Sequence, residues 1–239
     1  MNKITIRELV RHGLHATSLD QLLLRRRASR GLDVSYLRTG ARKEAFERIY
    51  RQGIWLVGPN RDCLSGAGSR LEATAVLQAE LPKMIAQLGA DSLLDVGCGD
   101  FTWMRHVQLG VPYLGVDIVE SVIEENQRRH GSPLREFRCV DAVTEPLPAA
   151  DVVLCREVLF HLSFADATSL LSNVRASGAR YLIATTDEAT AFNADIRTGD
   201  FRVLNLRKRP FHLPAPMYEI RDDAVQDGRV MGVWRIADL

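Results

Sequence analysis

A turn that combines glycine with acidic residues, at the end of an apolar run, constrains this chain more than any other stretch. Residues 93–100 read Leu-Leu-Asp-Val-Gly-Cys-Gly-Asp. The apolar run fits a buried parallel strand, and Gly97 and Gly99 allow a tight turn that a ligand can approach closely. A second apolar run, residues 113–117, ends in Asp117. A carboxylate at this distance from the glycines suits hydrogen bonds from the two hydroxyls of a ribose.

These residues resemble the motifs of a known family. Residues 95–99 look like the first motif, Asp/Glu-x-Gly-x-Gly, of the class I S-adenosylmethionine (SAM) methyltransferases. Asp117 then matches their ribose-binding acid, and Asp141 matches the acid that meets the adenine amino group. The resemblance covers roughly residues 70–185 and implies SAM as the cofactor. It points to bacterial small-molecule methyltransferases of sugar, natural-product and polysaccharide pathways.

The order of predicted elements favours an α/β class with a Rossmann-like, seven-stranded, mostly parallel sheet. A C-terminal antiparallel hairpin is predicted around the turn at Asp227 and Gly228. The chain divides into an N-terminal helical extension with a lid loop, residues 1–69, and a SAM-binding methyltransferase domain, residues 70–239. Ser69 and Glu72 predict a capping box at the start of the first helix of this domain. The strands are predicted at residues 92–96, 113–117, 135–140, 151–155, 181–185, 217–221 and 230–236.

The N-terminal 69 residues contain two features with open interpretations. Residues 24–30 are rich in arginine, which is consistent with a solvated helix face or with an arm that meets an anionic substrate, RNA or a partner subunit. Trp55 is followed by Ser-Gly-Ala-Gly-Ser at residues 65–69. A similar arrangement in the related methyltransferases implies a lid over the cofactor, and the alternative is a plain linker.

Candidate site residues follow from the motifs and from the ends of the predicted strands. The cofactor-binding candidates are Trp55, Ser65, Gly66, Ser69, Asp95, Gly97, Cys98, Gly99, Asp117, Ile118, Asp141, Ala142, Cys155 and Arg156. His161 is the candidate general base, because a free imidazole with a pKa of about 6.5 accepts a proton at neutral pH. Some sugar methyltransferases of similar fold use a histidine in this region, whereas a histidine that only packs against the next helix is the alternative. Glu157 and Asp187 are the alternative bases, and polar residues of the long loop 186–216 are expected to line an acceptor pocket.

Charge, apolar runs and cysteine spacing limit the classes of partner that this chain is expected to bind. A net charge of +1 gives no general attraction to nucleic acid or to anionic membranes, and no apolar run approaches the ~20 residues of a membrane span. The four cysteines have no CxxC spacing, so reduced cysteines, a cytoplasmic location and no metal site are expected. The expected partner is a small-molecule acceptor; nucleic acid is disfavoured, and a homodimer is left open.

Together these patterns predict a SAM-dependent methyltransferase that moves a methyl group to an oxygen or nitrogen of a small polar acceptor. A sugar-like or anionic acceptor is left open. The alternatives are an RNA or protein methyltransferase and a non-catalytic SAM-binding protein. A nicotinamide dehydrogenase is disfavoured, because the third glycine of its fingerprint is missing.

Overall fold

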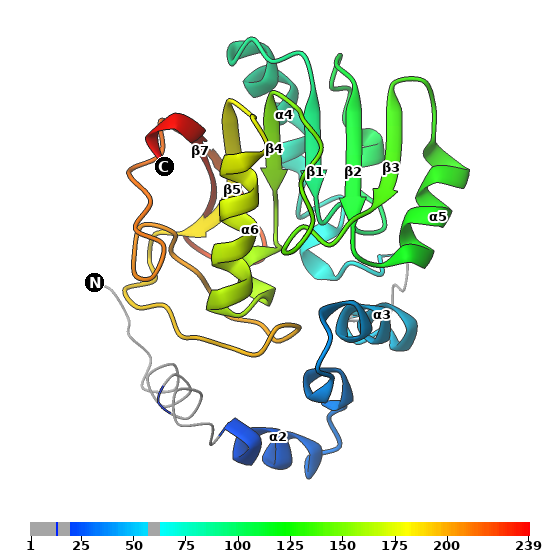
Figure 1. Cartoon of the computed structure of the whole chain (residues 1–239), viewed down its shortest axis with the longest axis vertical. Coiled ribbons are helices and arrows are strands. Elements are labelled where there is room, and N and C mark those ends of the chain that lie inside the picture. Colours follow the sequence, from blue (N-terminus) through cyan, green and yellow to red (C-terminus); the bar gives the residue numbers. More distant parts are fainter. Residues whose placement is uncertain (1–12, 14–19, 57–62) are drawn as a thin grey trace.

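A seven-stranded sheet forms the centre of the computed structural model, which describes residues 13, 20–56 and 63–239 (Figure 1). The strand order is β3-β2-β1-β4-β5-β7-β6, with β7 antiparallel to both of its neighbours and the other pairs parallel. This arrangement confirms the predicted fold class, including the C-terminal hairpin. The strands are β1 (Leu93–Val96), β2 (Tyr113–Asp117), β3 (Arg135–Cys139), β4 (Val152–Cys155), β5 (Tyr181–Asp187), β6 (Tyr218–Arg221) and β7 (Arg229–Arg235).

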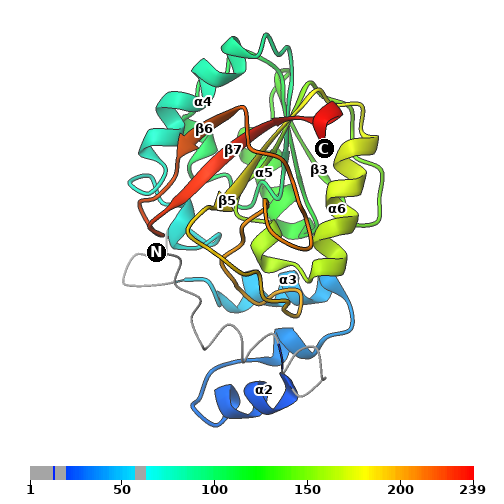
Figure 2. The ribbon, with the colours of Figure 1, turned by 90° about the vertical axis from the view of Figure 1, so that its left-hand side faces the viewer.

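Helices cover both faces of the sheet. Those that flank the sheet are α4 (Ala75–Gln87), α5 (Glu120–His130) and α6 (Phe164–Ala176), whereas α2 (Asp20–Ala28) and α3 (Arg42–Gln52) lie beyond the carboxyl ends of its parallel strands. Figure 1 shows α6 in front of the sheet and α4 behind it, and the view in Figure 2 separates these two layers. Side chains alternate along β1, so Leu94 packs in the core with α6 whereas Leu93 packs in the core with α4. The same alternation in β4 accounts for the continuous apolar runs of the sequence, since both faces are buried.

The α4 region differs from the sequence prediction. The predicted capping box is wrong, because α4 begins at Ala75 and Ser69 lies in a separate 3-10 turn, Ala67–Ser69. Residues 71–74 form turns before the helix, and the Thr74 hydroxyl donates to the Arg70 carbonyl there at 2.9 Å. Pro82 lies inside α4, and the helix continues through it.

The structure does not test several of the predictions made from the sequence. The turn expected at residues 58–60 and the helices expected within residues 1–12 and 14–19 fall outside the described residues. The division of the chain after residue 69 stays a prediction. Within the described residues, no helix has the length and apolar character needed to cross a membrane, and no cluster of His, Cys, Asp or Glu could hold a metal ion.

The long connection from β5 to β6 is ordered by its own polar side chains. Asn193 donates to the Asn205 carbonyl at 2.8 Å and to the Arg209 carbonyl at 2.9 Å. The buried Arg202 guanidinium donates to the Leu162 carbonyl, at the entry to α6. These polar residues therefore satisfy backbone groups of the connection and its neighbours.

The cap of α6 gives a test of the fold. Ser163→Ala should lower the free energy of unfolding by about 1 kcal/mol, because the Ser163 hydroxyl accepts a hydrogen bond from the Asp166 N–H in the first turn. Urea denaturation measures this loss, with the exposed Ser172→Ala on the same helix as the control. Equal losses in the two variants would contradict the capping role.

Candidate functional site

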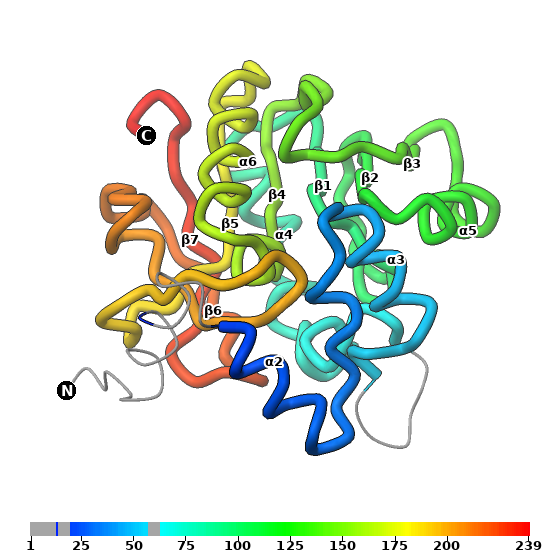
Figure 3. Tube along the Cα trace, turned by 60° about the horizontal axis from the view of Figure 1, so that its bottom comes forward, coloured from blue at the N-terminus to red at the C-terminus, as the bar shows by residue number. Residues whose placement is uncertain are grey.

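A cavity lies at the carboxyl ends of the parallel strands, where α/β sheets bind ligands. The space within it is about 940 Å³, open solvent at its mouth included. Figure 1 shows the arrowheads of β1 to β4 pointing towards α3. In Figure 3 the bottom of that view comes forward, so α3 is seen in front of the strand ends. Arg42, Phe46 and Tyr50 of α3 line the cavity together with the strand ends. The N-terminal segment therefore completes the site.

The glycine turn after β1 is held in place by main-chain and carboxylate contacts. Gly97 and Gly99 have φ angles of +74° and +57°, which favour glycine. The Gly97 N–H donates to the Val116 carbonyl at 2.8 Å, and the Gly99 N–H donates to the Asp117 carboxylate at 3.0 Å. A Cβ atom on Gly97 would lie 2.3 Å from Val158 Cγ2. The turn thus lies tightly between the ends of β2 and β4.

The two carboxylate oxygens of Asp117 accept hydrogen bonds from two different segments of the main chain. Its Oδ2 accepts from the Gly99 N–H, and its Oδ1 accepts from the Val119 N–H at 3.0 Å. Burial raises the pKa of Asp117, and the backbone hydrogen bonds oppose that rise. Since each carboxylate oxygen can accept two hydrogen bonds, both oxygens retain capacity for hydroxyl donors.

Asp95 lines the cavity but is deeply buried. It accepts a hydrogen bond from the Tyr113 hydroxyl at 2.7 Å. Burial raises the pKa of Asp95 to about 7, and the charge of Asp117 adds to this effect, while the Tyr113 hydroxyl and Arg156 oppose it. The Asp95 carboxyl therefore titrates near neutral pH.

An ion-pair network connects α3 to the far end of the cavity. Arg42 donates to Asp141 at 2.7 Å and to Asp166 of α6 at 3.1 Å. Burial alone would raise the pKa of Asp141, but hydrogen bonds from Arg42, Thr144 and the Val143 N–H together lower it. Asp141 is thus a charged acceptor whose position depends on the N-terminal segment.

The loop at residues 65–69 is fastened at both ends to the strand ends. Ser65 accepts at its hydroxyl from the Asp100 N–H at 2.9 Å, and its own N–H donates to the Asp100 carboxylate at 3.2 Å. The Gly68 carbonyl accepts from Arg156 at 2.9 Å. The loop therefore lies directly over the glycine turn, as a cover for the cavity would.

His161 is held on two sides. Its Nδ1 is 2.8 Å from the Asp200 carbonyl oxygen, and its ring stacks on Trp55 with centroids 4.6 Å apart and an interplanar angle of 27°. A carbonyl oxygen can only accept, so Nδ1 carries the proton and Nε2 of the neutral ring has a free lone pair. Removal from water lowers the pKa of His161, which favours this neutral form.

Most of the predicted residues come together at the cavity. Its lining includes Trp55, Ser65, Ser69, Asp95, Gly97, Cys98, Gly99, Asp117, Ile118, Asp141, Ala142, Arg156, Glu157 and His161. Gly66, Cys155 and Asp187 do not line it. Cys155 is 1% exposed in the core with α6, and the Asp187 carboxylate accepts from the Thr190 N–H at 3.0 Å.

Sequence reasoning missed several lining residues. These are Arg42, Phe46, Tyr50 and Trp103, together with the apolar Val96, Val116, Val140, Val143, Val158, Leu162 and Leu170. The helical spacing of the aromatic residues in α3 indicated a packed helix. No local pattern indicated that the face of this helix covers a ligand site formed by strand ends far along the chain.

Comparisons with known proteins agree with this arrangement. Residues 94–178 match a family model described as a methyltransferase domain, and comparison with curated proteins gave no match. Human N-acetylserotonin methyltransferase in complex with SAM superposes with a TM-score of 0.53, at 14% identity over 69% of this chain and 53% of that chain. This similarity shows a shared fold.

Two further solved structures are similar to smaller degrees. Magnesium protoporphyrin IX methyltransferase from Synechocystis PCC 6803, with bound SAM, has a TM-score of 0.46 at 18% identity, over 66% of this chain and 82% of that chain. A SAM-bound amino pentose methyltransferase from Micromonospora echinaspora has a TM-score of 0.40 at 21% identity, over 45% of this chain and 48% of that chain. This chain therefore spans from about half to about four fifths of the lengths of these proteins.

The raised pKa of Asp95 gives a stability prediction. Between its ordinary pKa of 3.8 and about 7, the native carboxyl retains a proton that the unfolded chain releases, so the free energy of unfolding falls as pH rises. Asp95→Asn still accepts from Tyr113 but cannot ionise. The variant should therefore be little different from the wild type near pH 4 and more stable than it above pH 7. Thermal unfolding across this pH range measures the effect, and a difference independent of pH would contradict it.

Proposed function

We propose that this chain, a class I SAM-dependent methyltransferase by its fold and by the match over residues 94–178, methylates an oxygen or nitrogen atom of a small polar acceptor. SAM supplies the methyl group, activated on a sulfonium, and the protein supplies binding, orientation and a place for a proton. The observation that carries the proposal is the neutral His161 ring, with Nε2 free, at the wall of the cavity.

The donors and acceptors of the cavity fit the cofactor. Asp117 retains capacity for two ribose hydroxyls, and Asp141 retains capacity for an adenine amino group beside its three internal donors. The apolar side chains of Ile118, Val143 and Leu170 offer surfaces for an aromatic base. This division into acidic ends and apolar walls matches a nucleoside.

The aromatic rings and hydroxyl groups of the cavity suit the sulfonium and the amino-acid portion of the cofactor. Tyr50 and Trp55 present aromatic rings, whose faces attract cations. Ser65 and Ser69 add hydroxyl groups from the loop that covers the glycine turn. A closed loop at this position would exclude water from the reacting atoms.

His161 is the proposed general base. An acceptor hydroxyl would lose its proton to His161 Nε2 as its oxygen forms the new bond to the methyl carbon and the bond from sulfur to that carbon breaks. The Asp200 carbonyl fixes the tautomer and stabilises the imidazolium that results. An amine that binds in its neutral form attacks with its lone pair and needs to lose a proton only after methylation.

Helix α2, which contains most of the arginine-rich run at residues 24–30, is held to the rest of the chain by ion pairs. Arg27 of α2 pairs with Asp200 at 3.0 Å, and Arg197 forms an ion pair with Asp20 at the start of α2. These contacts give α2 a role in holding the loop that supplies the Asp200 carbonyl.

Asp117→Ala should weaken SAM binding, because each charge-assisted hydrogen bond lost contributes about 1.5–3 kcal/mol. Titration calorimetry with SAM measures the change, and the exposed Asp91→Ala serves as a matched control. Unchanged affinity in a folded Asp117→Ala variant would remove Asp117 from the ribose site.

His161→Ala should lower turnover by roughly 10²–10⁴-fold while SAM affinity stays close to that of the wild type. His161→Asn retains a donor for the Asp200 carbonyl but lacks a basic nitrogen, so it should be equally slow. The wild-type rate should fall at low pH with a midpoint below 6.5, because the pKa of His161 lies below that ordinary value. The exposed His106→Ala is the control. Near-normal turnover in a folded His161 variant that binds SAM would exclude its role as the base.

A further inference from the structure

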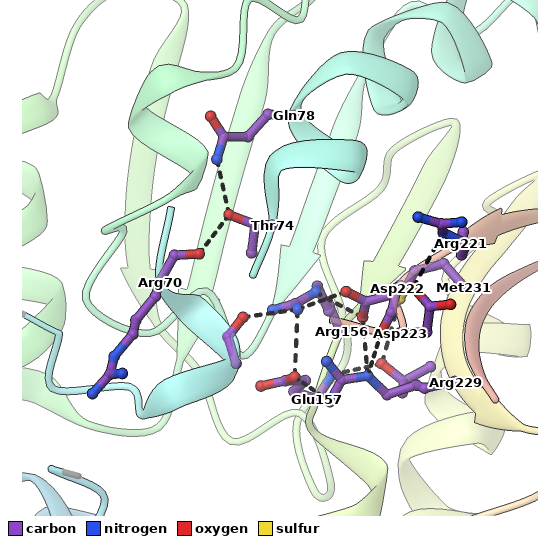
Figure 4. Close-up of polar contacts among 12 residues, drawn as sticks. Arg70, Thr74, Gln78, Arg156, Glu157, Arg221, Asp222, Asp223, Arg229 and Met231 are labelled. Carbon is purple, nitrogen blue, oxygen red and sulfur yellow. Dashed lines mark hydrogen bonds and ion pairs between the residues drawn. The ribbon is translucent and has the colours of Figure 1, made fainter. Parts of the chain in front are cut away.

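Four charged side chains form a buried cluster beside the cavity (Figure 4). Arg156 and Glu157 follow β4, Asp222 follows β6 and Arg229 begins β7. Arg156 donates to both Asp222 carboxylate oxygens, at 2.9 and 3.1 Å. Arg229 donates to the Asp222 carbonyl at 2.8 Å, and its Nη1 lies 2.6 Å from Glu157 Oε1. The two arginines and two acids balance in charge.

Arg156 and Glu157 both line the cavity, and Glu157 is the most exposed member of the cluster. The side-chain exposures are 3% for Arg156, 0% for Asp222 and 6% for Arg229, compared with 14% for Glu157. Both ion pairs of Glu157 fall on its Oε1, at 2.6 Å from Arg229 and 3.4 Å from Arg156. Within the described part of the chain, neither carboxylate oxygen accepts a hydrogen bond of good geometry, although Oε1 lies close to both arginines. The cluster therefore holds the carboxylate through charge and leaves it acceptor capacity for a ligand.

The backbone of Glu157 is held in an uncommon conformation. Its φ of +59° lies in the left-handed region, which is unfavourable for a residue with a side chain. The Glu157 N–H donates to the Thr185 hydroxyl at 2.8 Å, so β5 supports this conformation. Strained residues of this kind persist where the surroundings fix them, and they concentrate at functional sites.

Gly68 provides the surface on which the carboxylate lies. A Cβ atom on Gly68 would be 2.1 Å from both Glu157 carboxylate oxygens. Gly68 does not have a positive φ, so alanine at this position would displace the Glu157 carboxylate without straining the backbone. The loop and the carboxylate are thus fitted to each other, and Arg156 reinforces the fit through its bond to the Gly68 carbonyl at 2.9 Å.

We infer that Glu157 recognises the acceptor: its Oε2 accepts a hydrogen bond from a hydroxyl or ammonium group of the molecule to be methylated. Arg229 is a positioning residue that holds Oε1. A fixed carboxylate at the cavity wall favours polyhydroxylated or amino acceptors and repels carboxylates and phosphates. This inference rests on the proposed function and narrows it, because an anionic acceptor is no longer favoured.

The test uses the full-length protein, labelled SAM and a small-molecule cell extract, with the labelled product separated by ion exchange into cationic, neutral and anionic fractions. The wild type should place the label in the neutral or cationic fraction. Glu157→Gln and Gly68→Ala should each lower the initial rate at low extract concentration by about tenfold or more, which corresponds to one hydrogen bond to a charged group. Their SAM affinity by calorimetry should stay close to that of the wild type. Gly40→Ala, with open space around its Cα, should have the wild-type rate.

The outcomes separate this inference from the function beneath it. A label confined to the anionic fraction, or unchanged rates in both variants, would overturn the role of Glu157 and leave the methyltransferase intact. A fall in SAM affinity in Glu157→Gln, with the dependence on acceptor unchanged, would place Glu157 at the cofactor and overturn the inference as well. No labelled product with the wild type would overturn the proposed function itself. Arg229→Lys, which retains a cation, should restore part of the rate lost in Arg229→Met if Arg229 acts by positioning Glu157.

Discussion

The hydrogen bond from the Gly99 N–H to the Asp117 carboxylate joins the ends of two neighbouring parallel strands, and the ligand cavity depends on it. Parallel strands bring their carboxyl ends to one edge of a sheet, where backbone N–H groups and side chains need partners. Asp117 satisfies main-chain donors on both sides of the turn and still has acceptor capacity. One carboxylate thus stabilises the turn and retains acceptor capacity for the proposed ribose contact.

The N-terminal segment completes the site through charged contacts as well as apolar packing. Arg42 connects α3 to Asp141 and α6, and the arginine and aspartate pairs of α2 hold the loop that carries Asp200. Half-buried ion pairs of this kind depend on good geometry for their contribution. They connect both proposed contacts, the adenine acid and the base, to a part of the chain that the sequence motifs do not cover.

The sequence predicted the sheet well, because its central strands β1, β2, β4 and β5 are mostly apolar runs with glycine, proline or charged residues near their ends. The residues that follow β1, β2 and β3 were found for the same reason, since a strand end in this fold is a ligand position. Arg42 and Tyr50 were not found, because their roles depend on contacts with residues far along the chain. Cys155 was placed at the cofactor because it ends a strand, yet the alternation of β4 directs it into the core with α6. The partnership of Glu157 with Arg229 and Gly68 was equally invisible, since it joins three segments separated by about 70 to 90 residues.

The central claim is that one cavity, formed by the strand ends, the loop at residues 65–69 and α3, binds the methyl donor with its sulfur facing His161 and Glu157. A crystal structure with S-adenosylhomocysteine tests this most directly. The account predicts the ribose at Asp117, the adenine beside Asp141 and the sulfur at the end of the cavity where Trp55 stacks on His161. A ligand bound in the reverse direction, or outside this cavity, would contradict it.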